Sequence, residues 1–433
     1  MIESYRRSTP IRRLTAPIRR FLHVEAAGGG VLLICTAVAL LLANSAWAKP
    51  IHDFWETGLR IGVGAWEVDK PLHFWVNDLL MAVFFFVVGL EIKREIVAGE
   101  LSSPKKAALP VIAALGGMLV PAGIYLAFDH SGPAARGWGV PMATDIAFVV
   151  GILAAFGSRV PFGLKIFLLS LAIADDMGAV LVIAVAYTDH LDVAMLALAA
   201  AGFGLVVVLN WLGVRLVGVY VLVGAGIWLA VYKAGIHPTV AGVLLGLLTP
   251  ATAWLNRETL RLALTEVSGQ LDDTSELVEI RPGDVAILWY AAREAVAPLQ
   301  RLEDRLHPWV GFVIMPVFAL ANAGVEIRPA AILEPVALAI AAGLVLGKTL
   351  GILGFSWIAV KLGFASLPRG VTWPMMLAAG VLGGVGFTMS LFIANLALPP
   401  ELQAAAKTGI LAGSTIAAVA GAGLLAWSVS SKR

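Results

Sequence analysis

Four charged residues lie inside long apolar stretches of the sequence, where a charge is costly. Asp145 lies within residues 137–158, the adjacent Asp175 and Asp176 lie within 166–188, and Lys348 lies within 335–360. A charge at the centre of a bilayer costs at least about 2.5–3.5 kcal/mol on insertion scales, so such residues are hypotheses for function. Three acids and one base leave a net negative site, which we expect to hold a cation, protons or both.

Asp175 and Asp176 are the pair best suited to exchange a cation for protons. Successive residues of a helix point about 100° apart, so the two carboxylates can border one cavity, each with a different neighbour. Burial favours the protonated form of a carboxylate, and the same oxygens bind small hard cations. Competition between the two is the physical basis of cation/proton exchange. The alternative is structural, with one aspartate forming an ion pair with Lys348.

Two stretches rich in helix breakers, Gly137–Asp145 and Gly380–Thr388, predict interrupted helices. An interrupted helix exposes unpaired N–H and C=O groups inside the bilayer, and each end carries roughly half a charge. We expect Asp145 to neutralise N-terminal ends and Lys348 to neutralise C-terminal ends. Thr144 is expected either to lend an oxygen to the cation or to cap a half-helix.

The composition predicts a membrane protein. Of 433 residues, 59% are apolar and 14% are charged, against about 25% charged residues in soluble domains. A net charge of +2 gives no field that attracts nucleic acid, and the single Cys35 excludes an internal disulfide and a thiolate metal cluster. We therefore expect an all-α polytopic membrane protein in contact with lipid, without a cofactor and without enzymatic activity.

Twelve apolar stretches are expected to cross the bilayer as helices, because lipid offers no partner for open strand edges. They are residues 26–48, 71–90, 107–128, 137–158, 166–188, 193–214, 216–232, 234–256, 306–325, 335–360, 370–400 and 408–431. Spans 1–8 occupy about residues 26–250 and spans 9–12 occupy 306–431. A basic N-terminus, residues 1–25, precedes them, and a charged cytoplasmic loop, 251–305, divides them.

The basic residues predict the orientation. Of 31 Lys and Arg residues, 23 fall on the side of the N-terminus and 7 on the other side, and Lys348 lies within a span. The positive-inside rule then places both termini in the cytoplasm. A signal peptide ending at residues 46–48 is the rival interpretation of the N-terminus, but its apolar run is as long as a span. We expect the first helix to be retained.

The two interrupted spans occupy corresponding places in two sets of three. Each is second in its set, residues 107–188 and 335–431, and the two sets have opposite topology. Paired interrupted helices are the best sequence indication of a transporter built from inverted repeats. The alternative is that glycine in these helices only permits close packing.

Six motifs in order carry a resemblance to a known family. They are Phe84–Glu95, Ala143–Phe148, Leu171–Ala179, Phe318–Gly324, Gly347–Gly351 and Gly383–Ser390. Over about residues 20–430 the chain resembles the NhaA-type sodium/proton antiporters of bacterial inner membranes. The resemblance implies two crossing interrupted helices, electrogenic exchange of one Na⁺ or Li⁺ for two protons, and activation at alkaline pH. The family is often dimeric, so a homodimer is one expected state.

The resemblance also implies roles for single residues. Asp175 and Asp176 match the ion site, Lys348 matches the lysine held near the first of them, and Asp145, preceded by Thr144, matches the aspartate that balances half-helix ends. The residues that match positions of the pH response are Glu91, Glu95, His237 and Glu303. From the residues alone, Glu91 and Glu95 are predicted to lie at a solvated helix end, and His237 is predicted to be a packed histidine. The long loop and the Arg-rich start depart from the family pattern.

Three rival functions stay open at this stage. An intramembrane aspartyl protease needs two facing aspartates on separate helices, for which Asp145 and Asp175 are the candidates. A passive cation channel differs by lacking proton counter-transport. A transporter for another proton-coupled substrate differs in its response to Na⁺, Li⁺ and K⁺.

Overall fold

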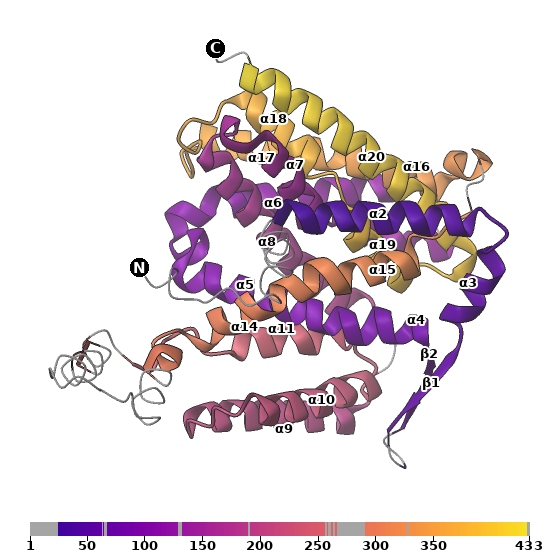
Figure 1. Ribbon diagram of the computed structural model, residues 1–433. Coiled ribbons are helices and arrows are strands. Elements are labelled where there is room, and N and C mark those ends of the chain that lie inside the picture. Colours follow the sequence, from indigo (N-terminus) through magenta and orange to yellow (C-terminus); the bar gives the residue numbers. More distant parts are fainter. Residues whose placement is uncertain are drawn as a thin grey trace, which may run out of the picture.

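Helices dominate the computed structural model, which describes residues 25–62, 64, 67–128, 132–188, 191–255, 258, 261–262, 265, 291–326 and 329–430. The long helices run in roughly one direction, across the view of Figure 1. Of the predicted basic N-terminus, only Glu25 belongs to the described residues, and most of the loop predicted for residues 251–305 lies outside them.

The helical elements, in which η marks a 3₁₀ or π turn, fall into two halves of the chain. The first half contains α2 (Glu25–Ala43), α3 (Ala48–Trp55), α4 (Leu72–Phe74), η2 (Trp75–Leu80), α5 (Met81–Ala98), η3 (Glu100–Ser102), α6 (Pro104–Phe128), η4 (Gly132–Met142), α7 (Ile146–Phe156), η5 (Gly157–Arg159) and α8 (Phe162–Ala186). The second half contains α9 (Val193–Trp211), α10 (Val217–Lys233), α11 (Thr239–Leu248), α14 (Pro298–Trp309), η6 (Val310–Ile314), α15 (Met315–Asn322), η7 (Pro329–Leu333), α16 (Pro335–Ala342), η8 (Gly343–Gly347), α17 (Lys348–Lys361), α18 (Trp373–Leu382), α19 (Phe387–Ala397) and α20 (Pro400–Ser430).

The described residues confirm a polytopic membrane protein made of helices. Seven of their helices are long and apolar enough to cross a membrane, or nine if α2 with α3 and α18 with α19 each count as one bent span. Helices α10 and α11 are apolar but shorter. Each of the twelve predicted stretches overlaps a helix of the structure, but that all twelve cross the bilayer stays a prediction.

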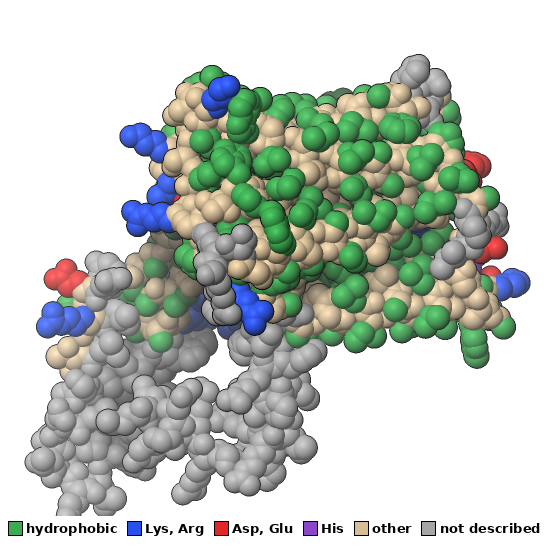
Figure 2. Space-filling model, turned by 90° about the horizontal axis from the view of Figure 1, so that it is seen from above, with side chains coloured by type: hydrophobic (Ala, Val, Ile, Leu, Met, Phe, Trp, Pro, Cys, Tyr) green, Lys and Arg blue, Asp and Glu red, His purple; other side chains and the backbone are tan. Residues whose placement is uncertain are grey.

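The outer surface is suited to lipid. Figure 2 shows one face covered by hydrophobic side chains, with most of the visible Lys and Arg side chains toward one end. Large apolar side chains are widely exposed, among them Leu222 on α10, Val185 on α8 and Trp427 on α20. In water such a surface would favour aggregation, whereas in a bilayer it is the solvated surface.

One connection departs from the expectation of an all-α chain. Between α3 and α4, strands β1 (Gly58–Ile61) and β2 (Val68–Pro71) pair antiparallel as a two-stranded hairpin. Its residues are mostly exposed. The hairpin lies at the end of the bundle opposite the start of α14 (Figure 1), so it belongs to a connection beyond the helix ends.

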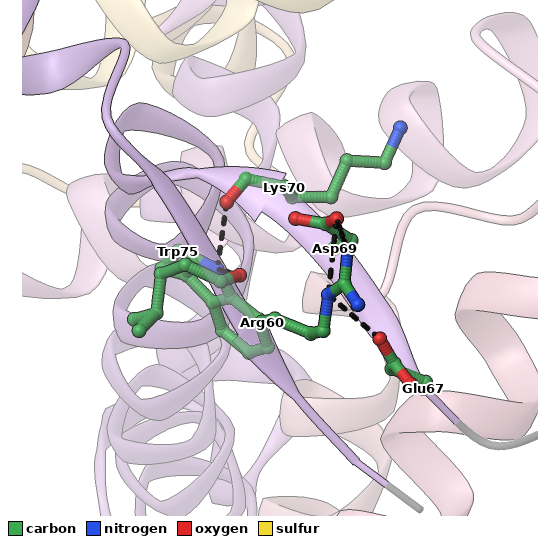
Figure 3. Close-up of polar contacts among 6 residues, drawn as sticks. Arg60, Glu67, Asp69, Lys70 and Trp75 are labelled. Carbon is green, nitrogen blue, oxygen red and sulfur yellow. Dashed lines mark hydrogen bonds and ion pairs between the residues drawn. The ribbon is translucent and has the colours of Figure 1, made fainter. Parts of the chain in front are cut away.

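Cross-strand charges hold this hairpin. Arg60 lies opposite Asp69 in the register, and its guanidinium contacts the carboxylates of Asp69 and Glu67, each at 2.8 Å. The indole Nε1 of Trp75 donates to the carbonyl of Lys70 at 3.2 Å (Figure 3). Because Trp75 opens η2, this bond attaches the hairpin to the helix below it.

Glycines bring α5 and α11 into backbone contact. A Cβ added at Gly246 would lie 2.5 Å from the carbonyl oxygen of Phe86 and 2.8 Å from the Cα of Gly89. Real Cβ atoms do not approach so closely, so only glycine fits. Small residues that let backbones approach are typical of helix pairs in membranes.

Gly246→Val is expected to destabilise this contact by about 1–3 kcal/mol, the usual cost of overpacking. A lower melting temperature of the purified protein in detergent would show it. Gly226→Val on α10 is the matched control, because nothing lies within 4 Å of its added Cβ. Equal melting temperatures for the two variants would contradict the packing argument.

Candidate ion site at two crossing interrupted helices

The two predicted interruptions are present and meet each other. In the first, η4 ends at Met142, residues 143–145 are extended, and α7 begins at Ile146. In the second, α18 and α19 are separated by Gly383–Gly386 and bent by 45°. A Cβ added at Gly386 would lie 2.9 Å from the carbonyl oxygen of Ala143. The crossing therefore requires a residue without a side chain at that position.

Backbone groups left unpaired by the interruptions bond across the crossing. The amide of Asp145 donates to the carbonyl of Val385 at 2.7 Å, and the hydroxyl of Thr144 donates to the carbonyl of Gly383 at 2.8 Å. Thr144 therefore satisfies a carbonyl at the end of α18. These bonds take the place of water, which the bilayer does not supply.

Asp145 joins the N-terminal ends of both half-helices. Its Oδ1 accepts from the amides of Ala147 at 3.1 Å and Phe148 at 3.4 Å, which caps α7. Its Oδ2 accepts from the amide of Thr388 at 3.1 Å and from the Thr388 hydroxyl, at the start of α19. One buried carboxylate thus faces two helix N-termini, where a negative charge is favourable. The geometry supports the predicted electrostatic role of Asp145.

Asp175 and Asp176 lie side by side on α8 and are both buried, with 2% and 1% of their surface exposed. Lys348, fully buried, contacts Asp175 with its Nζ 2.5 Å from Oδ2. The charges that act on Asp176 are those of Asp175, Glu91 on α5, Asp145 and Lys348. Among the described residues, Lys348 is in direct contact with Asp175, and a separate neighbour for each aspartate stays a prediction.

Lys348 is placed by an irregular turn. The π turn η8 ends at Gly347, directly before it, and such turns within helices occur frequently at functional sites. The predicted compensation of C-terminal helix ends by Lys348 stays a prediction, since the contact recorded for its Nζ is with Asp175. This contact also favours the alternative in which one aspartate serves as an internal ion-pair partner.

Each aspartate of the pair also has one carboxylate oxygen without a hydrogen-bond partner among the described residues. Oδ1 of Asp175 and Oδ1 of Asp176 are buried and have no hydrogen-bond partner among the described residues. A buried oxygen without a partner is costly, which makes both atoms ready acceptors for a proton or a cation. No group of three or more His, Cys, Asp or Glu side chains in the described part of the chain is arranged to hold a metal. A cation here would therefore rely on the two carboxylates with backbone or hydroxyl oxygens.

A second charged cluster lies where α5 and α14 meet. Glu303 forms an ion pair with Arg94, which also lies 3.8 Å from Glu95, and His307 Nδ1 lies 3.5 Å from Glu91. Burial raises the pKa of Glu303, and Arg94 partly offsets this. Three of the four residues predicted for the pH response are therefore brought together, and the charge of one of them, Glu91, also acts on Asp176.

Comparison with known proteins decides the family. The family described as Na⁺/H⁺ antiporter 1 matches residues 19–425. The chain belongs to this family. It is similar to the Na⁺/H⁺ antiporter NhaA of Rhodopirellula baltica, 51% identical over 421 residues, covering 97% of this chain and 96% of the relative. It is also similar to the NhaA of Rhizobium meliloti, 48% identical over 414 residues, covering 95% and 94%. The family expected from the six motifs is confirmed.

His237 lies far from the three other residues that the resemblance to the antiporter family assigned to the pH response. It precedes α11, which runs parallel to α5 with Gly242 packed on Ala82. His237 lies five residues before that contact and Glu91 lies nine residues after it. At 1.5 Å per residue the two are roughly 20 Å apart along the bundle. His237 is therefore near the opposite end from the cluster of Glu303.

Thr388 is the residue of the antiporter crossing that the sequence analysis did not single out. Its backbone amide and hydroxyl both bond to Asp145. The signal was present, because Thr388 follows the second glycine-rich interruption by two residues, where a helix N-terminus begins. Pairing it with Asp145, 243 residues away, needs the three-dimensional structure.

Proposed function

We propose that this protein exchanges Na⁺ or Li⁺ for protons across the bacterial inner membrane, at Asp175 and Asp176, and that it moves net charge in doing so. The observation that carries the proposal is the pair of adjacent buried carboxylates, each with one oxygen that has no partner among the residues the structure describes, beside two crossing interrupted helices. The names of the family and of the curated relatives support the choice of Na⁺ and H⁺.

The exchange follows from competition at those oxygens. When both carboxylates are deprotonated, their charge attracts Na⁺ from the cytoplasm, and oxygens near Thr144 complete its coordination. When Na⁺ leaves outside, protons neutralise the carboxylates for the return. Two protons for one Na⁺ give net transfer of one positive charge, so the membrane potential drives Na⁺ out. Only occupied states cross, which couples the two flows.

The proposed topology has twelve spans, both termini in the cytoplasm, and inverted repeats over residues 107–188 and 335–431. Its support is the overlap of each predicted stretch with a helix, the equivalent interruptions before α7 and α19, and the position of most of the visible Lys and Arg side chains toward one end (Figure 2). Rocking of one half against the other would open the site to each side in turn. A homodimer stays a prediction.

The proposal is tested in everted membrane vesicles with a fluorescent pH dye. Addition of Na⁺ or Li⁺ to energised vesicles should collapse the pH gradient, and K⁺ should not. An imposed membrane potential should change the rate if net charge moves. Cation flux without proton movement would favour a passive channel, and a response to K⁺ equal to that to Na⁺ would favour another cation substrate.

The protease alternative loses support from the geometry. Asp145 is engaged by amides and a hydroxyl at two helix N-termini, and Asp175 is engaged by Lys348. An aspartyl protease needs two carboxylates facing each other and free to hold a water between them. Neither of these two is free in that sense.

The cluster of Glu303 is proposed to set the pH response, together with Glu91, Glu95 and, less directly, His237. Because burial raises the pKa of Glu303, this side chain takes up a proton at a higher pH than an exposed glutamate. Protonation breaks its ion pair with Arg94. Falling pH therefore loosens the contact between α5 and α14, and rising pH restores it.

Glu303→Gln is expected to move the pH of half-maximal transport to more alkaline values, by roughly half a pH unit, equivalent to under 1 kcal/mol. The amide cannot ionise, so the cluster behaves at every pH as if Glu303 were protonated. Vesicle rates measured from pH 6 to 9 would show the shift. Glu100→Gln is the control, since the side chain of Glu100 lies 3.8 Å from Lys106 and its contact with Glu95 is made by the backbone amide, which the substitution keeps. Superimposable profiles for wild type and Glu303→Gln would remove Glu303 from the pH response.

A further inference from the structure

An apolar groove on the outer face of the bundle has no part in the exchange mechanism. It is an open groove of about 570 Å³ between α17, α18 and α20, lined almost entirely by carbon atoms. Three tryptophans, Trp357, Trp373 and Trp427, form much of its wall. Nothing lies within 4 Å of a Cβ added at Gly354, which also lines it, so the groove has room for more atoms.

The groove and the turn of helix that carries Lys361 together span about one membrane leaflet. It extends along α17 from Leu350 toward Trp357, one turn before Lys361 ends the helix. Eleven residues of helix separate Leu350 from Lys361, or about 16 Å, and half of a hydrocarbon core is about 15 Å. Trp373 at the start of α18 and Trp427 near the end of α20 lie at the same end as Lys361. Tryptophan at this level is typical of the membrane–water interface.

A positive charge marks the interfacial end of the groove. The Nζ of Lys361 lies 4.5 Å from the centre of the Trp357 ring, a cation–π contact. Lys361 is exposed, and no acidic side chain of the described residues forms a recorded ion pair with it. The groove thus offers apolar side chains at the depth of the acyl chains. The exposed ammonium of Lys361 lies beyond its end, at the level of the lipid headgroups.

We propose that this groove binds an anionic phospholipid, with one acyl chain between the three tryptophans and the phosphate beside Lys361. The depth matches an acyl chain, the carbon lining matches its chemistry, and the charge of Lys361 complements an anionic headgroup. Because α18 leads into the second interruption and Ile352 of α17 packs against Gly383, a lipid seated here contacts the part of the bundle that carries the crossing.

Native mass spectrometry of the purified full-length protein tests the proposal. The protein in detergent is titrated with phosphatidylglycerol and, separately, with phosphatidylcholine of the same acyl chains. We expect at least one phosphatidylglycerol to be retained at concentrations where phosphatidylcholine is not. Lys361→Gln should weaken phosphatidylglycerol binding about fivefold, the effect of one basic residue near a membrane surface. Gly354→Phe should fill the groove and weaken binding of both lipids.

Matched variants separate the groove from general effects. Gly204→Phe adds the same ring to an open, exposed position of α9, and Lys105→Gln removes an exposed charge elsewhere. Both should retain lipid like the wild type, and melting temperatures should show that all four variants are folded. If Gly354→Phe and Lys361→Gln also retain lipid like the wild type, the proposal is overturned. It is likewise overturned if Gly354→Phe instead dissociates a dimer, because the groove would then belong to a contact between subunits.

Discussion

Asp176→Asn is expected to slow the Na⁺-driven collapse of the vesicle pH gradient by roughly 100-fold or more, the size of effect that follows loss of a proton-transferring side chain. The amide keeps the shape of the carboxyl group but carries neither the negative charge that attracts Na⁺ nor an exchangeable acidic proton. Asp176 is buried, and one of its oxygens has no hydrogen-bond partner among the described residues. Substitution therefore removes a ligand without breaking a recorded side-chain contact.

The control for this prediction is an acid that lies outside the site. Asp304 on α14 is exposed, and Asp304→Asn should leave the vesicle rate unchanged. Calorimetry distinguishes an exchange site from a purely structural role of Asp176. Na⁺ binding to the wild type should release protons, so the measured heat should vary with the ionisation enthalpy of the buffer. Wild-type rates in Asp176→Asn, or Na⁺ binding without proton release, would show that the pair is not the exchange site.

The residues of the site could be predicted from the sequence because charged residues are rare in segments that cross a bilayer. Asp145, Asp175, Asp176 and Lys348 stand out in the sequence only because each interrupts an apolar stretch. All four are buried in the structure. The interruptions were predictable for the same reason, since glycine-rich segments inside a span leave backbone groups that must find partners.

Hydrogen bonds between residues far apart in the sequence could not be predicted from these patterns. The bond of Thr388 to Asp145 and that of Asp145 to Val385 depend on how two spans cross, which no local pattern encodes. The hairpin β1–β2 was missed because its strands have only four residues each and carry charges. Its strands are joined by cross-strand pairs such as that of Arg60 with Asp69, and these appear only once the register is known.

Lys348→Met is expected to lower the free energy of unfolding by about 3–5 kcal/mol, the range measured when one partner of a buried ion pair is removed. The Nζ of Lys348 is the recorded partner of Asp175 Oδ2 at 2.5 Å, and both side chains are buried. Without the ammonium, no cation of the described residues is paired with Asp175. Its carboxyl group must then stay buried as an uncompensated charge or take up a proton, and either costs free energy. A large fall in melting temperature in detergent would show this effect.

A double-mutant cycle separates the ion pair from loss of packing. Asp175→Asn combined with Lys348→Met replaces two charges with an amide and an apolar chain of similar size. Replacing both partners of a buried pair is often nearly neutral, so the double variant should recover most of the stability lost in Lys348→Met while staying inactive in vesicles. If the double variant is as unstable as the sum of the single variants, the two side chains do not interact and Lys348 acts through packing alone. The expected result is a double variant that regains stability but does not transport. Lys348 would then stabilise the charge of Asp175, and the exchange itself would depend on the carboxylates.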